Sequence, residues 1–110
     1  MRRLVLAALG ATFALAASAQ EAIDLFVQPG KGHCIACHAL PEGSGPSTRN
    51  DVGPKLEGAR MRELGRDAIR EIIGDMTQRN PDTVMPPFGR HRILTKAEIE
   101  RLTEFLHALP

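Results

Sequence analysis

Aromatic residues are scarce in this sequence. Its 110 residues include no tryptophan, no tyrosine and only four phenylalanines, one of which, Phe13, lies in the apolar N-terminal stretch. A chain of this length makes one small domain, and with so few large side chains it has little apolar surface to bury. We therefore expect something other than amino-acid side chains to complete its core.

Long hydrophobic runs are absent outside the N-terminus. Arg2 and Arg3 form a positive start, residues 4–16 are apolar, and residues 17–19 read Ala-Ser-Ala. This is the pattern of a secretory signal peptide with its cleavage site. A membrane anchor is the alternative, but the run is shorter than the ~20 residues that a spanning helix needs. We predict that residues 1–19 are removed and that residues 20–110 form one domain in the bacterial periplasm, without membrane insertion.

No strong charge of either sign remains once the signal is removed. The chain has 14 basic and 13 acidic residues, and the signal holds two of the basic ones, so the mature chain carries 12 against 13. A nearly neutral, slightly acidic protein is poorly suited to nucleic acid or to an anionic membrane surface as its main partner. We expect neither as a partner.

Cysteine occurs only twice, at Cys34 and Cys37, and His38 follows directly. Cys-x-x-Cys-His is the attachment motif of heme c. On one helical turn the two sulfurs share a face, spaced for thioether bonds to the heme vinyl groups, and the His38 imidazole is carried to the iron. Both thiols are then used, so no disulfide is expected. The motif predicts one covalent heme c, a large apolar plate that would complete the core.

Two other readings of the motif are a redox-active thiol pair and a zinc site. A thioredoxin-like pair belongs at a strand-to-helix turn, and no strand-rich segment precedes Cys34. For zinc, His33 and the motif supply four ligand-type residues, but sequence neighbours cannot all converge tetrahedrally. No second Cys/His pair follows at zinc-finger spacing. Heme attachment is the favoured interpretation.

The pattern beyond the motif predicts an all-α fold of short helices. A first helix is expected over residues 22–27, ended by Pro29 and Gly30, and a second over about residues 66–73, ended by Gly74. Glycine and proline make residues 41–54 a loop, and residues 80–94 are also irregular. Thr95 opens the last helix with a capping box. Its apolar stripe consists of Ile99, Leu102, Leu106 and Leu109, with Phe105 beside it.

An electron-transfer heme needs a second axial ligand opposite His38. The candidates are Met61, Met76, Met85, His33, His91 and His107. His33 adjoins the attachment turn and cannot reach the far face of the ring, and His107 is expected to face solvent. Met61 and Met76 flank the isoleucine-rich helix and suit packing. Met85 lies in a proline-stiffened loop, residues 80–89, that could hold a thioether over iron, with ordinary packing as the alternative.

A resemblance appears when these motifs are taken together. Residues 34–38, then Gly-Pro-Lys-Leu-Glu-Gly at residues 53–58, then a methionine in a loop before a terminal helix, resemble the class I cytochrome c fold. In that family the proline carbonyl accepts a hydrogen bond from the proximal imidazole. The resemblance implies that Pro54 O accepts from His38 Nδ1–H, which fixes the ring and its donor strength, and that Met85 is the distal ligand.

A narrower resemblance covers nearly the whole mature chain. Residues 31–38, 80–89 and 90–99 are similar to SoxX, the monoheme cytochrome family of bacterial sulfur oxidation. Its most specific part is Met-Pro-Pro-Phe-Gly at residues 85–89, which runs into Leu94-Thr95 and the last helix.

This resemblance implies a partnership. SoxX pairs with SoxA in a heterodimeric L-cysteine S-thiosulfotransferase, which joins thiosulfate to a cysteine of the carrier SoxYZ. This chain would bind no substrate, and its heme would pass electrons to a small soluble cytochrome. A free-standing electron shuttle, for example a donor to an oxidase or peroxidase, is one alternative. A heme sensor or catalyst that releases Met85 is another.

Overall fold

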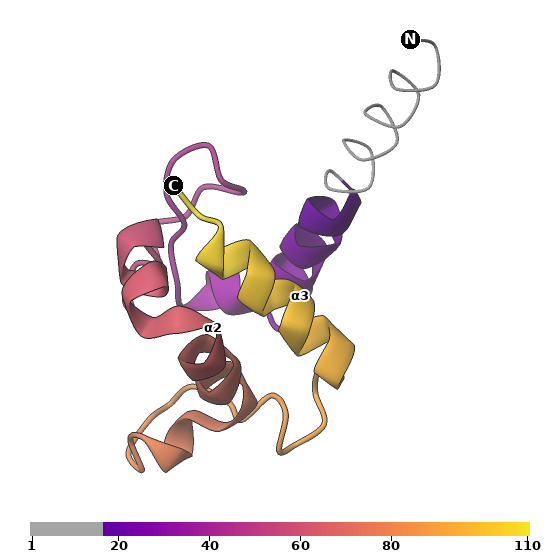
Figure 1. Cartoon of the computed structure of the whole chain (residues 1–110), viewed down its shortest axis with the longest axis vertical. Coiled ribbons are helices and arrows are strands. Elements are labelled where there is room, and N and C mark those ends of the chain that lie inside the picture. The colour runs from indigo at the N-terminus through magenta and orange to yellow at the C-terminus, as the bar shows by residue number, and fades with distance from the viewer. Residues whose placement is uncertain (1–16) are drawn as a thin grey trace, which may run out of the picture.

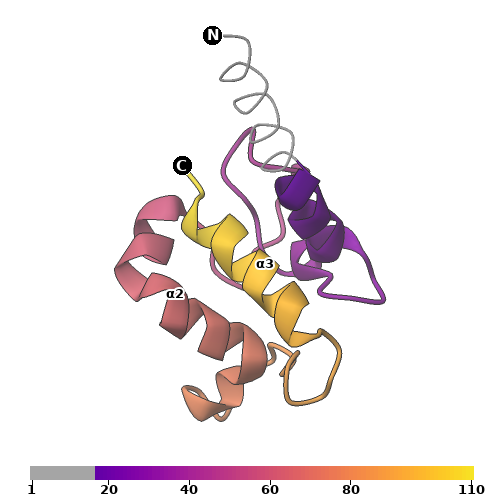
Figure 2. The same cartoon turned by 45° about the vertical axis from the view of Figure 1, so that its right-hand side comes forward.

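The computed structural model describes residues 17–110, and all regular structure in this range is helical. After a first helix over residues 17–27 come the 3₁₀ turn η1 (Cys34–Ala36), α2 (Gly58–Asp75), the 3₁₀ turn η2 (Met76–Gln78) and α3 (Lys96–His107). The helices α2 and α3 lie against each other, with the first helix near α3 (Figure 1 and Figure 2). The prediction of an all-α fold is confirmed.

The first helix ends where the sequence predicts, before Pro29. It buries Ala22, Leu25 and Phe26, and Glu21 pairs with Arg101 of α3 at 2.9 Å. Of the predicted signal peptide, residues 1–16 lie outside the described residues, and residues 17–19 are helical. Within residues 17–110 no helix combines the length and apolarity needed to cross a bilayer.

The second helix begins well before the predicted start near residue 66. It consists of two helical segments joined at Gly65, whose φ of 79° and ψ of 162° are not helical. Only glycine adopts such a conformation without strain. The first segment buries Gly58 and Met61, and the second buries Ile69 and Ile73, so both segments contact the core. The predicted helix corresponds to the second segment.

The last helix forms as the sequence predicts. Thr95 Oγ1 accepts from Glu98 N at 3.1 Å, and Glu98 Oε2 accepts from Thr95 N at 2.8 Å, which confirms the capping box. Along one face the helix buries Ile99, Leu102, Thr103 and Leu106, and Leu109, two residues after its end, is also buried. On its outer side, arginines of α2 pair with glutamates of α3: Arg66 with Glu104 at 2.8 Å and Arg70 with Glu100 at 2.7 Å.

One apolar core joins all of these elements. Its buried members come from the first helix, α2, α3 and the two long loops, and they include Phe26, Leu40, Phe88 and Leu94. Cys34 of the attachment turn and Met85 of the second loop are partly buried against this same cluster. The fold therefore brings both predicted iron-site segments to one core, although 51 positions separate them in sequence.

Candidate functional site

The attachment motif forms a compact turn. The 3₁₀ turn η1 spans Cys34–Ala36, Cys37 N donates to Cys34 O at 3.1 Å, and His38 N donates to the same carbonyl at 2.8 Å. His33 precedes the turn with a positive φ of 47° and is exposed. The turn therefore carries both thiols and the imidazole on five consecutive residues, and each of these three side chains is half-buried.

Both thiols are free, and one has a strongly perturbed acidity. Burial is the main reason that the pKa of the Cys34 thiol is raised to about 11. Redox-active Cys-x-x-Cys pairs require the opposite shift, because their nucleophile is a thiolate at neutral pH. At pH 7 Cys34 is a neutral thiol, which argues against the thioredoxin-like alternative.

The imidazole of His38 is oriented by the loop that follows it. His38 Nδ1 lies 2.6 Å from Pro54 O, and because a carbonyl can only accept, Nδ1 carries the proton and donates. Nε2 is then left with its lone pair, the tautomer that a metal-binding histidine needs. Gly53 packs on the ring so closely that an added Cβ would lie 2.7 Å from both Nδ1 and Nε2. A glycine is therefore required next to Pro54.

The loop that contains Met85 is fixed at both ends. Gly89 N and Arg90 N both donate to Gly74 O, at 3.0 and 3.1 Å, which closes the loop on the end of α2. Within it, Met85 N donates to Thr83 Oγ1 at 3.1 Å. The buried side chain of Phe88 joins the core directly after the two prolines. These contacts restrict the backbone of the loop near the methionine.

The other candidate ligands lie in different surroundings. Met61 is buried in the core at 6% exposure, in agreement with the predicted packing role. Met76 is half-buried in η2, His33 and His91 are exposed, and His107 is half-buried at the end of α3 rather than fully solvent-facing. Among the methionines of residues 17–110, Met85 is the one that is both partly buried against the core and placed in a loop.

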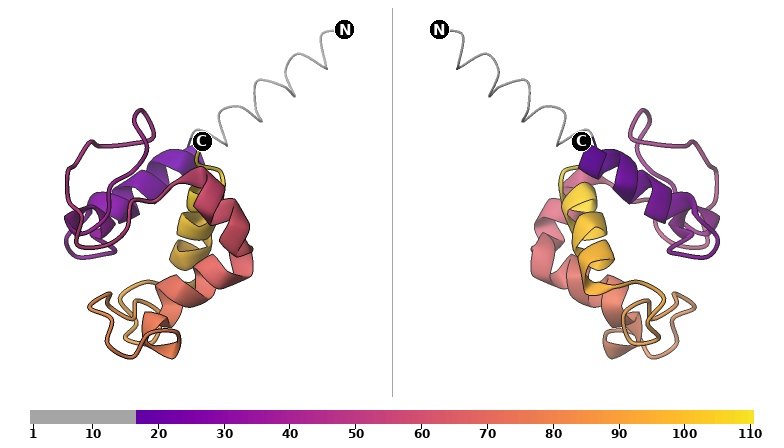
Figure 3. Two further views of the ribbon diagram at one scale, coloured as in Figure 1. Left: turned by 90° about the vertical axis from the view of Figure 1, so that its left-hand side faces the viewer. Right: turned by 90° about the vertical axis from the view of Figure 1, so that its right-hand side faces the viewer.

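The attachment segment and the Met85 loop lie on the same side of the helices, one above the other (Figure 3). The attachment segment carries two thiols and an imidazole, and the Met85 loop carries a thioether. Both segments pack against the same apolar cluster. Two free thiols on a single turn, an imidazole in the metal-binding tautomer and a thioether in a loop held by hydrogen bonds are the donor types that a c-type heme uses. The residues present therefore fit this cofactor.

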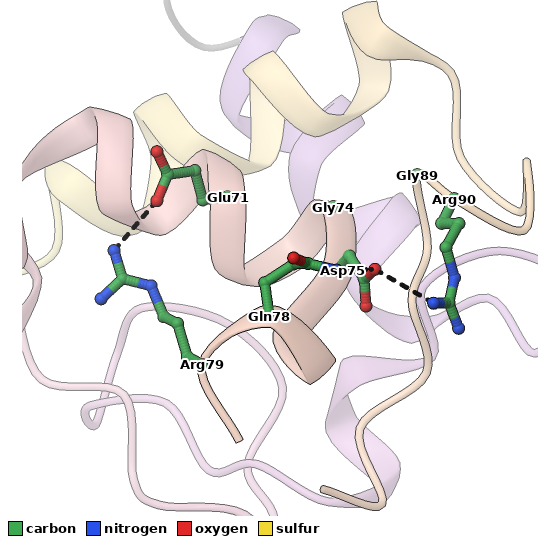
Figure 4. A pocket seen from close by; sticks show the side chains of 7 residues that line it. All are labelled: Glu71, Gly74, Asp75, Gln78, Arg79, Gly89 and Arg90. Carbon is green, nitrogen blue, oxygen red and sulfur yellow. Dashed lines mark hydrogen bonds and ion pairs between the residues drawn. The ribbon is translucent and has the colours of Figure 1, made fainter. Parts of the chain in front are cut away.

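A separate pocket of about 400 Å³ lies at the end of α2, lined by Glu71, Gly74, Asp75, Gln78, Arg79, Gly89 and Arg90 (Figure 4). Its charges are paired across it, Glu71 with Arg79 at 3.0 Å and Asp75 with Arg90 at 3.4 Å. None of the predicted ligands lines this pocket. Its ion pairs instead connect the two ends of the Met85 loop to α2.

Sequence reasoning missed two contacts that support the attachment turn. Lys31 Nζ lies 2.7 Å from Glu98 Oε1, so the capping residue of α3 also binds the segment before the motif. The contact with Lys31 is the main reason that the pKa of Glu98 is lowered. Asn50 Nδ2 donates to Ile35 O at 2.7 Å, between the two cysteines. Both contacts join residues distant in sequence, so no local pattern indicates them.

Comparison with protein families identifies a match for this chain. The model of the family described as cytochrome c oxidase, cbb3-type, subunit III matches residues 17–106, which is most of the chain. No curated protein matches the chain. The matched range includes the attachment turn, the loop with Pro54 and the loop with Met85.

Proposed function

The chain belongs to the family of cytochrome c oxidase, cbb3-type, subunit III, and we propose that it is the electron-accepting subunit of a periplasmic thiosulfate-oxidising complex. Family membership makes it a c-type cytochrome with a class I-like all-helical fold, an electron-transfer protein that binds heme c. The specific role, the residue assignments and the partner are our proposal.

The geometry around His38 supports our assignment of the site. Cys34 and Cys37 anchor one heme through thioethers, and His38 binds iron through Nε2, which the Nδ1 bond to Pro54 O at 2.6 Å leaves unprotonated. Met85 would hold the iron through its thioether, from the loop that Gly89 N and Arg90 N close on Gly74 O. A bound heme c with imidazole and thioether ligands supplies a one-electron iron couple with both faces closed, which suits electron transfer better than oxygen binding.

In this proposal no residue of this chain reacts with thiosulfate. Conjugation of thiosulfate to a thiol releases two electrons and one proton, so the complex needs a route that removes electrons one at a time. Both cysteines of this chain are used as heme anchors, and none remains to bind substrate. The thiol chemistry would occur on a SoxA-like partner and a SoxYZ-like carrier, and a small soluble cytochrome would accept the electrons.

One feature supports the sulfur-oxidation role over a generic electron carrier. Residues 85–89, Met-Pro-Pro-Phe-Gly, lead through Leu94 directly into the capping box at Thr95, and Phe88 and Leu94 are both buried. Ile93 N and Leu94 N both donate to Phe88 O, at 2.9 and 3.0 Å, so this stretch forms one folded unit with the start of α3. That unit is the part of the chain that most specifically resembles SoxX.

The alternative is a free-standing periplasmic shuttle. The name of the matched family does not point to sulfur oxidation, because it describes an oxidase subunit rather than a thiosulfate-oxidising one. Purification of a tagged chain from its native host distinguishes the two functions. Co-purification of a second heme protein, lost after dissociation in high salt, supports the complex. A monomeric holoprotein whose ferrous form is oxidised by membranes that contain a terminal oxidase contradicts it.

A further inference from the structure

Residues 50–56, which we call the strap, run alongside the attachment turn and are joined to it at regular intervals. Three donors spaced three residues apart bind three carbonyls at alternate positions: Asn50 Nδ2 to Ile35 O at 2.7 Å, Gly53 N to Cys37 O at 2.8 Å, and Leu56 N to Ala39 O at 2.9 Å. The bond from His38 Nδ1 to Pro54 O lies within this series. The register of the strap against the attachment turn therefore sets the position of the Pro54 carbonyl relative to His38.

The bond between His38 and Pro54 is open to water, since Pro54 is exposed and the His38 ring is only half-buried. An exposed hydrogen bond adds little net free energy, because water competes for both partners. Its persistence then depends on how firmly the surrounding backbone holds the carbonyl in place. Gly53 N and Leu56 N hold the strap on either side of Pro54 through their backbone amides.

Asn50 is the member of this series that acts through its side chain. The backbone N–H of Asn50 donates to Thr48 Oγ1 at 3.1 Å, which fixes the backbone from which the Asn50 side chain extends. Its Nδ2 then reaches a carbonyl located between the two heme-attachment cysteines. An amide suits this position because it donates to a carbonyl without adding charge near the site.

We propose that Asn50 is a positioning residue that keeps the Pro54 carbonyl in register with the iron-binding imidazole and thereby lowers the reduction potential. The proposal rests on His38 as the proximal ligand and is independent of any role in sulfur oxidation. Donation from Nδ1–H to a carbonyl increases the basicity of the ring, which stabilises ferric over ferrous iron. Loosening of the strap weakens that donation and raises the potential.

The test uses the holoprotein labelled with ¹⁵N-histidine, in which solvent exchange of the His38 Nδ1 proton is measured by NMR in the ferrous state. In Asn50→Ala we expect exchange to become roughly two- to tenfold faster, the factor produced by loss of one net hydrogen bond, and the reduction potential to rise. Asn50→Asp, which has no donor when ionised, should behave in the same way. Asn50→Gln should restore part of the protection.

Arg49→Ala is the matched control, because Arg49 is an exposed neighbour of Asn50 and its side chain makes no hydrogen bond or ion pair within residues 17–110. It should leave both readouts unchanged. A purely structural role for Asn50 would lower the melting temperature without changing the exchange rate or the potential, and that result overturns the proposal. If Asn50→Ala yields no holoprotein, the comparison of Asn50→Asp with Asn50→Gln decides, and equal exchange in both also overturns it.

The same spectra separate this inference from the ligand assignment. A wild-type His38 signal without the large shift of an iron-bound ring contradicts the proximal ligand itself. A strongly shifted His38 signal with wild-type exchange in Asn50→Ala contradicts only the role of Asn50. Failure to find a sulfur-oxidising partner affects neither result.

Discussion

Substitution of Gly53 by alanine tests the proximal geometry directly. The added Cβ would lie 2.7 Å from Nδ1 and Nε2 of His38, whereas ordinary van der Waals contact begins at 3.4 Å. The ring or the strap must therefore move by at least about 0.7 Å, and by more at Cε1 of His38, which lies nearer still to the added Cβ. Overpacking of this kind costs about 1–3 kcal/mol in folded proteins. Because Gly53 N is bonded to Cys37 O at 2.8 Å, the strap cannot retreat without losing that bond.

We expect Gly53→Ala to lower the free energy of unfolding of the holoprotein by about 1–3 kcal/mol. The reduction potential should also change, because movement of the His38 ring breaks its hydrogen bond to Pro54 O. Urea unfolding and a redox titration measure the two effects. Gly30→Ala is the control, since a Cβ at Gly30 meets no atom within 4 Å and Gly30 has no positive φ. If both variants unfold at the wild-type urea concentration and keep the wild-type reduction potential, that result contradicts the close packing of Gly53 against the His38 ring.

Three further outcomes follow from the fold. The double variant Cys34→Ala/Cys37→Ala, which cannot attach heme, should show weak helical circular dichroism and no cooperative thermal unfolding; a cooperative, fully helical apoprotein would contradict the view that heme completes the core. The contact with Lys31 lowers the pKa of Glu98, so its stabilisation is complete above the ordinary glutamate pKa and is lost as the pH falls through the lowered pKa. In Glu98→Gln, the urea midpoint should therefore fall less than in wild type between about pH 6 and pH 3, and equal falls would refute this. Gly65→Ala should lower the free energy of unfolding, measured with urea, by about 1–3 kcal/mol, because alanine is strained at φ 79° and ψ 162°. An unchanged urea midpoint would show that the helix is not interrupted at Gly65.

Local patterns predicted the parts of this fold that depend on neighbouring residues. The capping box needs only Thr95 and Glu98, three positions apart, and the buried stripe of α3 follows the helical period, so both were predictable. The end of the first helix before Pro29 has the same local origin. The turn at Cys34 follows from the spacing of the motif.

The first half of α2 was missed because glycine interrupts its pattern. Gly58 and Gly65 bracket residues 59–64, and a glycine usually marks the end of a helix. The spacing of Met61 and Leu64 is helical and could have indicated the segment, since both side chains pack in or against the core. The helix bends at Gly65 so that both segments bury their apolar faces.

Contacts of the strap with the attachment turn could not be derived from the sequence. The Gly-Pro pair at residues 53–54 suggests only a turn, and the acceptor role of Pro54 came from the family resemblance. Asn50 lies in a loop rich in polar residues, where asparagine is common for local reasons. Its bond to Ile35 O spans 15 positions, and only the path of the folded chain brings the two groups together.

The ferric absorption spectrum of the holoprotein tests the central claim most directly. Iron ligated by an imidazole and a thioether has a weak far-red band, and we expect it in the wild type and in Met76→Ala but not in Met85→Ala. Absence of the band from the wild type, with ready binding of carbon monoxide by the ferrous form, would contradict a closed electron-transfer heme with His38 and Met85 as its ligands. Persistence of the band in Met85→Ala would contradict the assignment of Met85.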